Sequence, residues 1–285
     1  MRIDRLLAAG TTISFEFFPP KTDAEERVLT RALGELEPLE PSFVSVTYRG
    51  GASSRERTFK LVRRLHTQGR MVPMAHLTCV HHSRAELVEI LAAYRDAGIE
   101  NLMLLGGDPD PEGGAVAELR HAIELVELAR EVGPFCIGVA AQPAGHPDSP
   151  DLASDRRHLA TKLAVADFAV TQLFFEAPAW RRLVDELAEL GVTKPVLPGI
   201  MPVTAVGSVQ RMREMGGEVP GWLVDRLEHA DAEGPGAVRA VGVAAATALC
   251  GELLADGAPG LHFYTLNRST ATREIVTSLR GVTLG

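Results

Sequence analysis

The sequence predicts a (β/α)8 TIM barrel, because eight strand-like apolar runs alternate with helical patterns along the whole chain. Most of these runs are almost continuously apolar, as expected for parallel strands that are covered on both faces. The 285 residues suffice for one barrel and contain no linker, repeat or low-complexity tract. We therefore expect a single barrel domain over residues 1–285, with a doubly wound open sheet as the structural alternative.

The expected strands and helices follow one another with clear boundary signals. The strands are residues 13–18, 43–48, 71–78, 101–107, 135–141, 168–175, 195–200 and 261–267. Thr22 and Glu25 have the spacing of a helix capping box, and Pro178 and Gly191 fit the start and end of another helix. Residues 203–257 are long enough for more than one helix, so one connection of the barrel is enlarged.

Charge and composition exclude several classes of protein. A net charge of −8 and the lack of a basic run argue against a nucleic-acid partner. Cys79, Cys136 and Cys250 lie far apart in apolar sequence, which predicts reduced core thiols, a cytoplasmic protein and no metal site. The N-terminus is too short and polar for a signal peptide, and no apolar run approaches the roughly 20 residues of a membrane span.

Polar residues recur where the expected strands end. In a barrel of this type the chemistry lies at the carboxyl ends of the strands. Each such residue taken alone has an ordinary structural explanation, such as a turn or a satisfied core side chain. The set consists of Glu16, Thr47, His76, Asp108, Gln142, His146, Gln172, Tyr264, Asn267 and Arg268.

Glu16 stands out because it interrupts the apolar strand "ISFEFF". Side chains alternate across a strand, so Phe15 and Phe17 should point away from the face that carries Glu16. That face is the barrel interior or its mouth. A carboxylate among aromatic residues loses hydration, so we expect the pKa of Glu16 to rise toward the working pH, as a general acid requires.

Two further patterns suggest contact with a ligand. The stretch "LLGGDPDPEGG" follows a strand but matches neither GxGxxG nor a P-loop, so its glycines would instead let the backbone approach a ligand closely. Asp155 and Lys162 lie seven residues apart on one face of a helix. This pair is either a solvated charged face or a pair that reaches the polar tail of a cofactor, and spacing alone does not decide.

Several segments together resemble methylenetetrahydrofolate reductase of the bacterial single-domain type. They are "SFEFFPPK", "FVSVTYRGG", "AHLTCV", "GGDPD", "VAAQPAGHP", "TQLFF", "LPGIMPV" and "HFYTLNRS", in order through nearly the whole chain. The resemblance implies a (β/α)8 barrel that carries FAD, uses NADH or NADPH, and reduces 5,10-methylenetetrahydrofolate to 5-methyltetrahydrofolate. It also implies a homo-oligomer that serves one-carbon metabolism and methionine biosynthesis.

The resemblance assigns roles to particular residues. Glu16 would be the acid that protonates the folate, and Asp108 the carboxylate near the pterin and the flavin. The folate would be bound by Gln172, Tyr264, Leu266 and Arg268, the last suited to a glutamyl carboxylate. FAD would be bound by Thr47, His76, Gly107, Asp108, His146, Asp155 and Lys162.

The chain departs from the family pattern at several positions. Gly106 stands where the family usually has arginine, and His121 and Gln142 stand where tyrosines are common. Met212 aligns with a stacking phenylalanine, and Ser208 with a glutamine. These differences predict weakened FAD binding and keep open a direct transfer of hydride from NADH to the folate.

Two other classes remain as alternatives. A barrel lyase or aldolase would need a Schiff-base lysine or a metal site at a strand end, and the lysines fall in expected loops or helices. The second alternative class is a partner protein of a methyltransferase that has little activity of its own.

Overall fold

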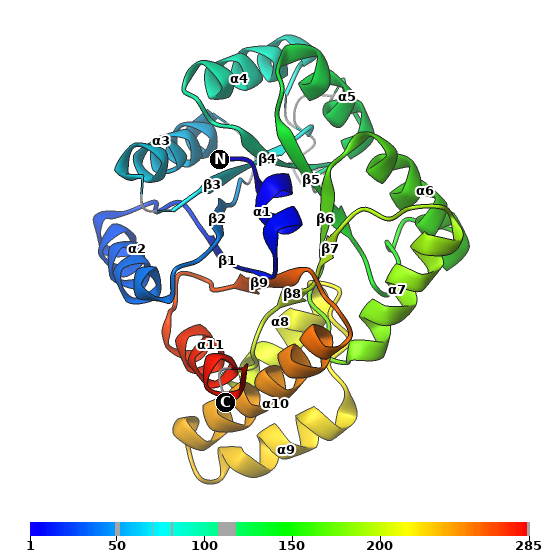
Figure 1. Ribbon diagram of the computed structural model, residues 1–285. Coiled ribbons are helices and arrows are strands. Elements are labelled where there is room, and N and C mark those ends of the chain that lie inside the picture. The colour runs from blue at the N-terminus through cyan, green and yellow to red at the C-terminus, as the bar shows by residue number, and fades with distance from the viewer. Residues whose placement is uncertain (49–51, 70, 81, 108–117, 284–285) are drawn as a thin grey trace.

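The computed structural model describes residues 1–48, 52–69, 71–80, 82–107 and 118–283. It confirms the predicted barrel: neighbouring strands run parallel around a central core, and helices surround them (Figure 1). The strands are β1 Thr12–Phe17, β2 Phe43–Val46, β3 Pro73–Thr78, β4 Asn101–Leu105, β5 Cys136–Ala141, β6 Phe168–Thr171, β7 Val196–Leu197, β8 Gly199–Ile200 and β9 Gly260–Tyr264.

Residues 196–200 close the barrel. The strand order is β7-β6-β5-β4-β3-β2-β1-β9-β8, so β7 pairs with β6 while β8 pairs with β9. Pro198 separates the two short strands because a proline has no N–H to offer to a ladder. Its carbonyl still accepts a hydrogen bond of 3.0 Å from the His262 backbone N–H. The segment thus acts as the one strand predicted at 195–200.

Several observed strands are shorter than predicted. The expected strand 168–175 ends at Thr171, and the expected strand 43–48 ends at Val46. In both cases the apolar run continues past the last ladder residue. Phe174 and Tyr48 are buried in the outer core between barrel and helices, so their apolar character reflects packing and not strand pairing.

The helices follow the predicted alternation. They are α1 Ile3–Ala9, α2 Asp23–Leu36, α3 Ala52–Gln68, α4 Arg84–Asp96, α5 Ala122–Val132, α6 Leu152–Val165, α7 Ala177–Glu189, α8 Val209–Glu214, α9 Gly221–Asp231, α10 Pro235–Ala255 and α11 Thr270–Thr283. Thr22 caps α2, with its side chain accepting from the Glu25 N–H. The Glu25 carboxylate accepts from the Lys21 N–H, so only half of the predicted capping box forms.

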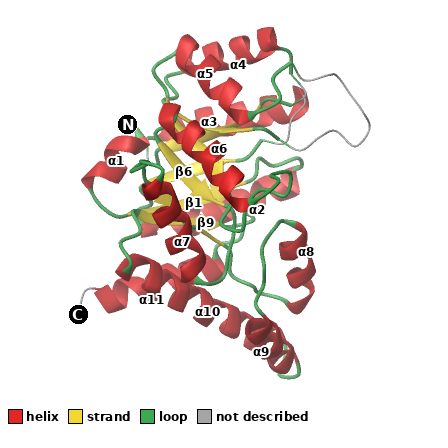
Figure 2. Ribbon diagram, turned by 90° about the vertical axis from the view of Figure 1, so that its right-hand side faces the viewer, coloured by secondary structure: helices red, strands yellow, loops and turns green. Residues whose placement is uncertain are grey.

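Helix α1 was not predicted, and it covers the floor of the barrel. Ile3 is fully buried and belongs to a cluster with Phe43, Met74 and Phe168 from the barrel interior. The Asn101 side chain accepts from the Ile3 N–H at 2.8 Å and so ties the helix to β4. Figure 2 shows α1 at one end of the barrel and α8 toward the other. The polar strand ends therefore face away from α1.

The enlarged connection before the last strand contains α8, α9 and α10, as expected. Helix α10 has the length and composition of a membrane span although Arg239 and Glu252 interrupt its apolar sequence, and the prediction that no apolar run approaches that length did not anticipate it. It packs against α9 and α11, and its Gly242 lies so close to the Val203 carbonyl that an added Cβ would sit 1.7 Å from the oxygen. A core helix of a globular domain has the same composition, so α10 alone is weak evidence of a membrane.

Candidate active site

Glu16 lies inside the barrel at the carboxyl end of β1. Phe15 and Phe17 point outward into the core between barrel and helices, as the alternation predicted, and both are fully buried. Glu16 itself is 8% exposed. In the sheet it stands opposite Ser45 of β2 on one side and Tyr264 of β9 on the other. Three adjacent strands therefore position it.

Polar side chains from three other strands meet one carboxylate oxygen of Glu16. The Ser45 hydroxyl donates to Oε2 at 3.4 Å. His76 Nε2 lies 3.5 Å from the same oxygen, and His262 Nε2 lies 3.7 Å from it. Glu16 is thus a buried carboxylate among two imidazoles and a hydroxyl.

This environment corrects the predicted direction of the pKa of Glu16. Burial raises the pKa, as expected from the sequence, but His262, His76 and Ser45 act in the opposite sense and hold the pKa of Glu16 below its usual value. Phe15 and Phe17 do not surround the carboxylate, because their rings pack on the other face of the sheet. Burial also lowers the pKa of His76, which Glu16 only partly offsets.

His262 is oriented by a second residue of β1. The Ser14 hydroxyl lies 2.8 Å from His262 Nδ1 and 3.2 Å from the Leu261 carbonyl oxygen, so it holds one edge of the ring. His262 Nε2 faces Glu16 and Ser45, so an N–H at Nε2 donates toward the ionised carboxylate. A proton on His262 Nε2, or one on Glu16, lies between the imidazole and the carboxylate.

Tyr264 packs in the barrel wall beside this cluster. Its hydroxyl donates to the Thr171 carbonyl at 2.6 Å, and its ring meets His262 edge-on with centroids 5.5 Å apart. An added Cβ on Gly199 would lie 2.6 Å from the Tyr264 ring, so the glycine makes room for it. Burial and the charge of Glu16 both raise the pKa of Tyr264, which therefore stays a neutral phenol.

The other predicted folate residues lie at the same end of the barrel. Gln172 directly follows β6 and is partly buried, with its side-chain oxygen accepting from the Leu173 N–H at 2.9 Å. Leu266 and Arg268 are exposed on the loop after β9. Leu266 has φ 51° and Asn267 φ 58°, a left-handed turn that is unusual for leucine.

Asn267 fixes that turn against β1. Its side-chain oxygen accepts from the Phe18 N–H at 2.8 Å, and its side-chain nitrogen donates to the Phe18 carbonyl at 2.9 Å. The Thr265 hydroxyl donates to the Glu16 carbonyl. The loop that carries Leu266 and Arg268 is thus joined to the strand that carries Glu16.

Unpartnered polar atoms mark the ends of β2 and β3. Within the described ranges, Thr47 Oγ1, His76 Nε2 and Thr78 Oγ1 are buried and have no hydrogen-bond partner. Just beyond β4, Gly107 has φ 88°, and an added Cβ would lie 2.3 Å from Val80 Cγ2. Buried polar atoms are normally satisfied, so this surface suits a polar ligand held close to the backbone. Thr47, His76 and Gly107, all predicted to contact FAD, fit such a group.

The remaining predicted cofactor residues lie on α6 and the loop before it. Asp155 is 7% exposed, and Lys162 donates to the Ala140 carbonyl at 3.0 Å. Burial lowers the pKa of Lys162, while Asp155 partly restores it. The two residues are therefore not a solvated charged face. The His146 side chain is 49% exposed on the loop.

One predicted site residue cannot be placed, and three residues of the site were not predicted. Asp108 lies outside the described residues. The sequence analysis did not identify Ser14, Ser45 and His262. Ser14 lies on the same inward face of β1 as Glu16, and His262 lies on the same inward face of β9 as Tyr264. The alternation of side chains, applied to every strand, would have found all three.

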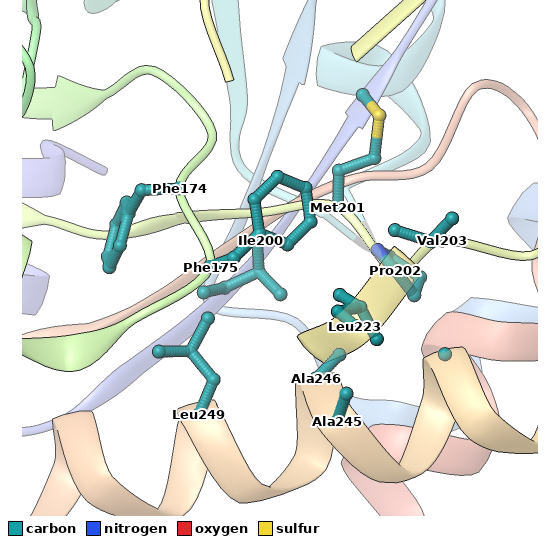
Figure 3. A pocket seen from close by; sticks show the side chains of 11 residues that line it. Phe174, Phe175, Ile200, Met201, Pro202, Val203, Leu223, Ala245, Ala246 and Leu249 are labelled. Atoms are coloured by element: carbon teal, nitrogen blue, oxygen red, sulfur yellow. The ribbon is translucent and has the colours of Figure 1, made fainter. Parts of the chain in front are cut away.

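A small apolar pocket lies apart from this site. Figure 3 shows an apolar pocket of about 10 Å³ between α10 and the outer surface of the barrel, lined in part by Phe174, Ile200 and Leu249. It has room for about one water and lies outside the barrel interior. In the described part of the chain, no group of three or more His, Cys, Asp or Glu side chains is arranged to hold a metal ion.

The chain is similar to known proteins over almost its whole length. A family model described as methylenetetrahydrofolate reductase matches residues 2–280. The 5,10-methylenetetrahydrofolate reductase of Pectobacterium carotovorum is 35% identical, covering 96% of this chain and 91% of the relative. That of Escherichia coli K12 is 33% identical, covering 94% and 90%.

A solved structure supports the fold. An uncharacterized protein from Clostridium thermocellum, described as binding two copies of 5-methyl-5,6,7,8-tetrahydrofolic acid, aligns with a TM-score of 0.67 at 11% identity and covers 100% of this chain and 99% of its own. At that identity the likeness concerns the barrel alone. The family match and the identity to curated relatives over almost the full length place the chain in the methylenetetrahydrofolate reductase family.

Proposed function

We propose that the protein reduces 5,10-methylenetetrahydrofolate to 5-methyltetrahydrofolate with NADH or NADPH, through bound FAD. The single observation that carries the proposal is the position of Glu16, a buried carboxylate at the active end of the barrel with His76 and His262 beside it. The reaction adds a hydride and a proton to the substrate. A buried acid next to groups that store a proton is what the proton half of that reaction requires.

Glu16 supplies the proton in this proposal. Protonation of one nitrogen beside the methylene carbon lets that C–N bond break and leaves an electrophilic iminium on the other nitrogen. The low pKa of Glu16 means that its proton must be held nearby until it is needed. His262 is suited to hold it, because Ser14 fixes the ring with Nε2 toward the carboxylate.

Residues at the ends of β2 to β5 would hold the cofactor. Thr47, His76 and Gly107 supply the unpartnered atoms and the close backbone approach described above, and His146 and Lys162 lie on the adjoining loop and helix. Bound FAD would supply a two-electron carrier between the nicotinamide and the folate. Lys162, with a lowered pKa and one backbone acceptor, can add a donor for an anionic or carbonyl group.

The folate would lie over Tyr264 with its tail toward the loop after β9. Arg268 is exposed there and can form two parallel hydrogen bonds to a glutamyl carboxylate. Leu266, 41% exposed, offers an apolar contact to the part of the substrate between the ring system and the tail. Gln172 lies across the barrel mouth and offers an amide to the ring system.

Direct transfer of hydride from NADH to the folate is the second candidate. Gly106 favours this direct transfer. The family resemblance predicts an arginine at this position, and glycine provides no cation to bind the phosphate groups of FAD. In that case Thr47, His76 and His146 would bind the nicotinamide nucleotide.

One experiment separates the two. The purified protein is titrated with FAD while flavin fluorescence is followed, and NADH oxidation with methylenetetrahydrofolate is measured with and without added FAD. The proposal predicts saturable FAD binding and activity that rises with FAD. A colourless protein that ignores FAD yet oxidises NADH with the folate would establish direct transfer. No folate-dependent oxidation under either condition would contradict both.

A further inference from the structure

Arg156 is a buried arginine that the sequence analysis did not single out. Its side chain is 3% exposed. Its charge is balanced by two carboxylates: Nη1 lies 2.9 Å from Asp155 Oδ2, and Nε lies 2.7 Å from Glu186 Oε2 on α7. Without the guanidinium, the buried Asp155 carboxylate would lose its ionic partner.

The rest of the guanidinium binds the backbone of the loop after β5. Nη1 donates to the Gln142 carbonyl at 2.9 Å, and Nη2 donates to the Pro143 carbonyl at 2.8 Å. The Gln142 carbonyl also accepts from the Gly145 N–H, which closes the turn. Arg156 therefore fixes the point at which the loop leaves the strand.

Asp155 fixes the next part of the same loop. Its Oδ1 accepts from the His146 backbone N–H at 3.0 Å and from the Ser149 hydroxyl at 3.4 Å, while Arg156 occupies Oδ2. Both oxygens of Asp155 are thus used within the protein. The Asp155–Arg156 pair at the start of α6 organises the whole loop from Gln142 to Ser149.

The loop in turn orients the His146 imidazole. His146 Nδ1 accepts from the Asp148 N–H at 3.2 Å, so in the neutral ring the proton is on Nε2. The half-exposed ring therefore offers a donor to a ligand. This geometry exists only while the loop keeps its turn, which depends on Arg156.

We propose that Arg156 is a positioning residue for cofactor binding, which acts by fixing the loop 142–149 so that His146 faces the cofactor. The inference rests on the proposed function, since it takes this loop as part of the FAD site. Arg156 cannot contact the cofactor itself, because it is buried and four of its N–H groups are already used. Asp155 likewise acts through the loop.

The test compares Arg156→Met and Arg156→Lys with Arg130→Met. Arg130 is a matched control, because it also binds backbone carbonyls, those of Val165 and Phe135, but at the opposite end of the barrel. Two quantities are measured for each variant: hydrogen–deuterium exchange of residues 142–151 without cofactor, and the FAD Kd from flavin fluorescence.

Arg156→Met should speed exchange of the loop and raise the FAD Kd by about tenfold to hundredfold, the range found for outer residues that orient metal ligands. Arg156→Lys should fall between it and the wild type, because lysine keeps a charge but lacks the planar fork. Arg130→Met should change neither quantity, whatever its loss of stability. If Arg156→Met does not fold, Arg156→Lys carries the test.

Three results would overturn the inference. One is unchanged exchange and FAD affinity in the folded variants. Another is faster loop exchange at unchanged FAD affinity, which would separate the loop from the cofactor. The third is a wild-type protein that binds no FAD, which would be seen before any variant is made and would contradict the cofactor part of the proposed function as well.

Discussion

At the scale of single residues, the protonation of Glu16 depends on neighbours from distant parts of the sequence. The sequence predicted its inward direction, because alternation within a strand is a local property. It did not predict the direction of the pKa shift, because His76 and His262 come from other strands that only the closed barrel brings to the carboxylate. Local sequence thus determines which way a side chain points, and tertiary structure determines its charge.

His262→Phe should move the alkaline limit of folate turnover to higher pH. Without His262, burial of Glu16 is less opposed, so its pKa rises. A general acid is active while protonated, so turnover falls as pH rises through its pKa, and a raised pKa shifts that fall upward. The pH dependence of kcat/KM measures the shift. Ser14→Ala should give a smaller shift in the same direction. A limit that stays in place or moves to lower pH would show that His262 does not set this limit by lowering the pKa of Glu16.

Arg268→Ala should act mainly on folate affinity. Arg268 is exposed on the loop after β9, where a guanidinium can pair with a carboxylate of the glutamyl tail. The folate KM should rise while kcat changes much less, because a contact made equally in the ground and transition states affects binding alone. Steady-state kinetics with varied folate measure both. A fall in kcat at constant KM would place Arg268 away from the tail.

At the scale of elements, the sequence predicted which segments form strands better than it predicted their ends. Eight strand segments were expected and found, but Tyr48 and Phe174 extended the apolar pattern beyond the ladders because they pack in the outer core. Helix α1 was missed, although Ile3, Leu6 and Leu7 have helical spacing. Nothing local shows that this short segment covers the barrel floor, since its partners come from other strands.

Gly106→Arg should tighten FAD binding. No atom lies within 4 Å of the position of a Cβ at Gly106, so a side chain fits there. A charge-assisted hydrogen bond contributes roughly 1.5–3 kcal/mol, or about one to two decades of affinity. Gly107→Ala should instead weaken FAD binding. Gly107 has a φ of 88°, and an added Cβ would collide with Val80 and Thr78. Titration with FAD distinguishes the two variants. Equal or weaker binding by Gly106→Arg would mean that this side does not face the anionic part of the cofactor.

At the scale of the whole molecule, closure of the barrel creates the site. Glu16, His76, His262 and Tyr264 become neighbours because β9 pairs with β1, and residues 196–200 complete the ring. The alternation of strands and helices predicted this closed topology, since a chain of this length with eight such units favours a barrel. The Pro198 break and the contact of Tyr264 with Gly199 depend on three-dimensional packing and could not be predicted. The homo-oligomer and the cytoplasmic location stay predictions.

Gly199→Ala should weaken closure and catalysis together. The added Cβ would lie 2.3 Å from the Thr171 carbonyl oxygen and 2.6 Å from the Tyr264 ring. The first of these is strand backbone, so the barrel wall must shift, and overpacking of this kind typically costs about 1–3 kcal/mol. Thermal unfolding should show a lower Tm, and folate turnover should fall. Gly251→Ala, on α10 with no atom within 4 Å of the added Cβ, is the control: its Tm should not fall, because alanine favours a helix over glycine, and its turnover should stay unchanged. A Gly199→Ala protein with wild-type Tm and turnover would contradict the described closure.

Glu16→Gln tests most directly whether Glu16 is the acid that protonates the folate. The amide is nearly isosteric and still accepts from Ser45, so the fold should persist. Two activities are compared: NADH oxidation with methylenetetrahydrofolate, and NADH oxidation with menadione, which needs no folate proton. If Glu16 is the acid, the first activity should fall by about 10²–10⁴-fold and the second should change little. Wild-type folate turnover by Glu16→Gln, or an equal loss of both activities, would contradict this role of Glu16.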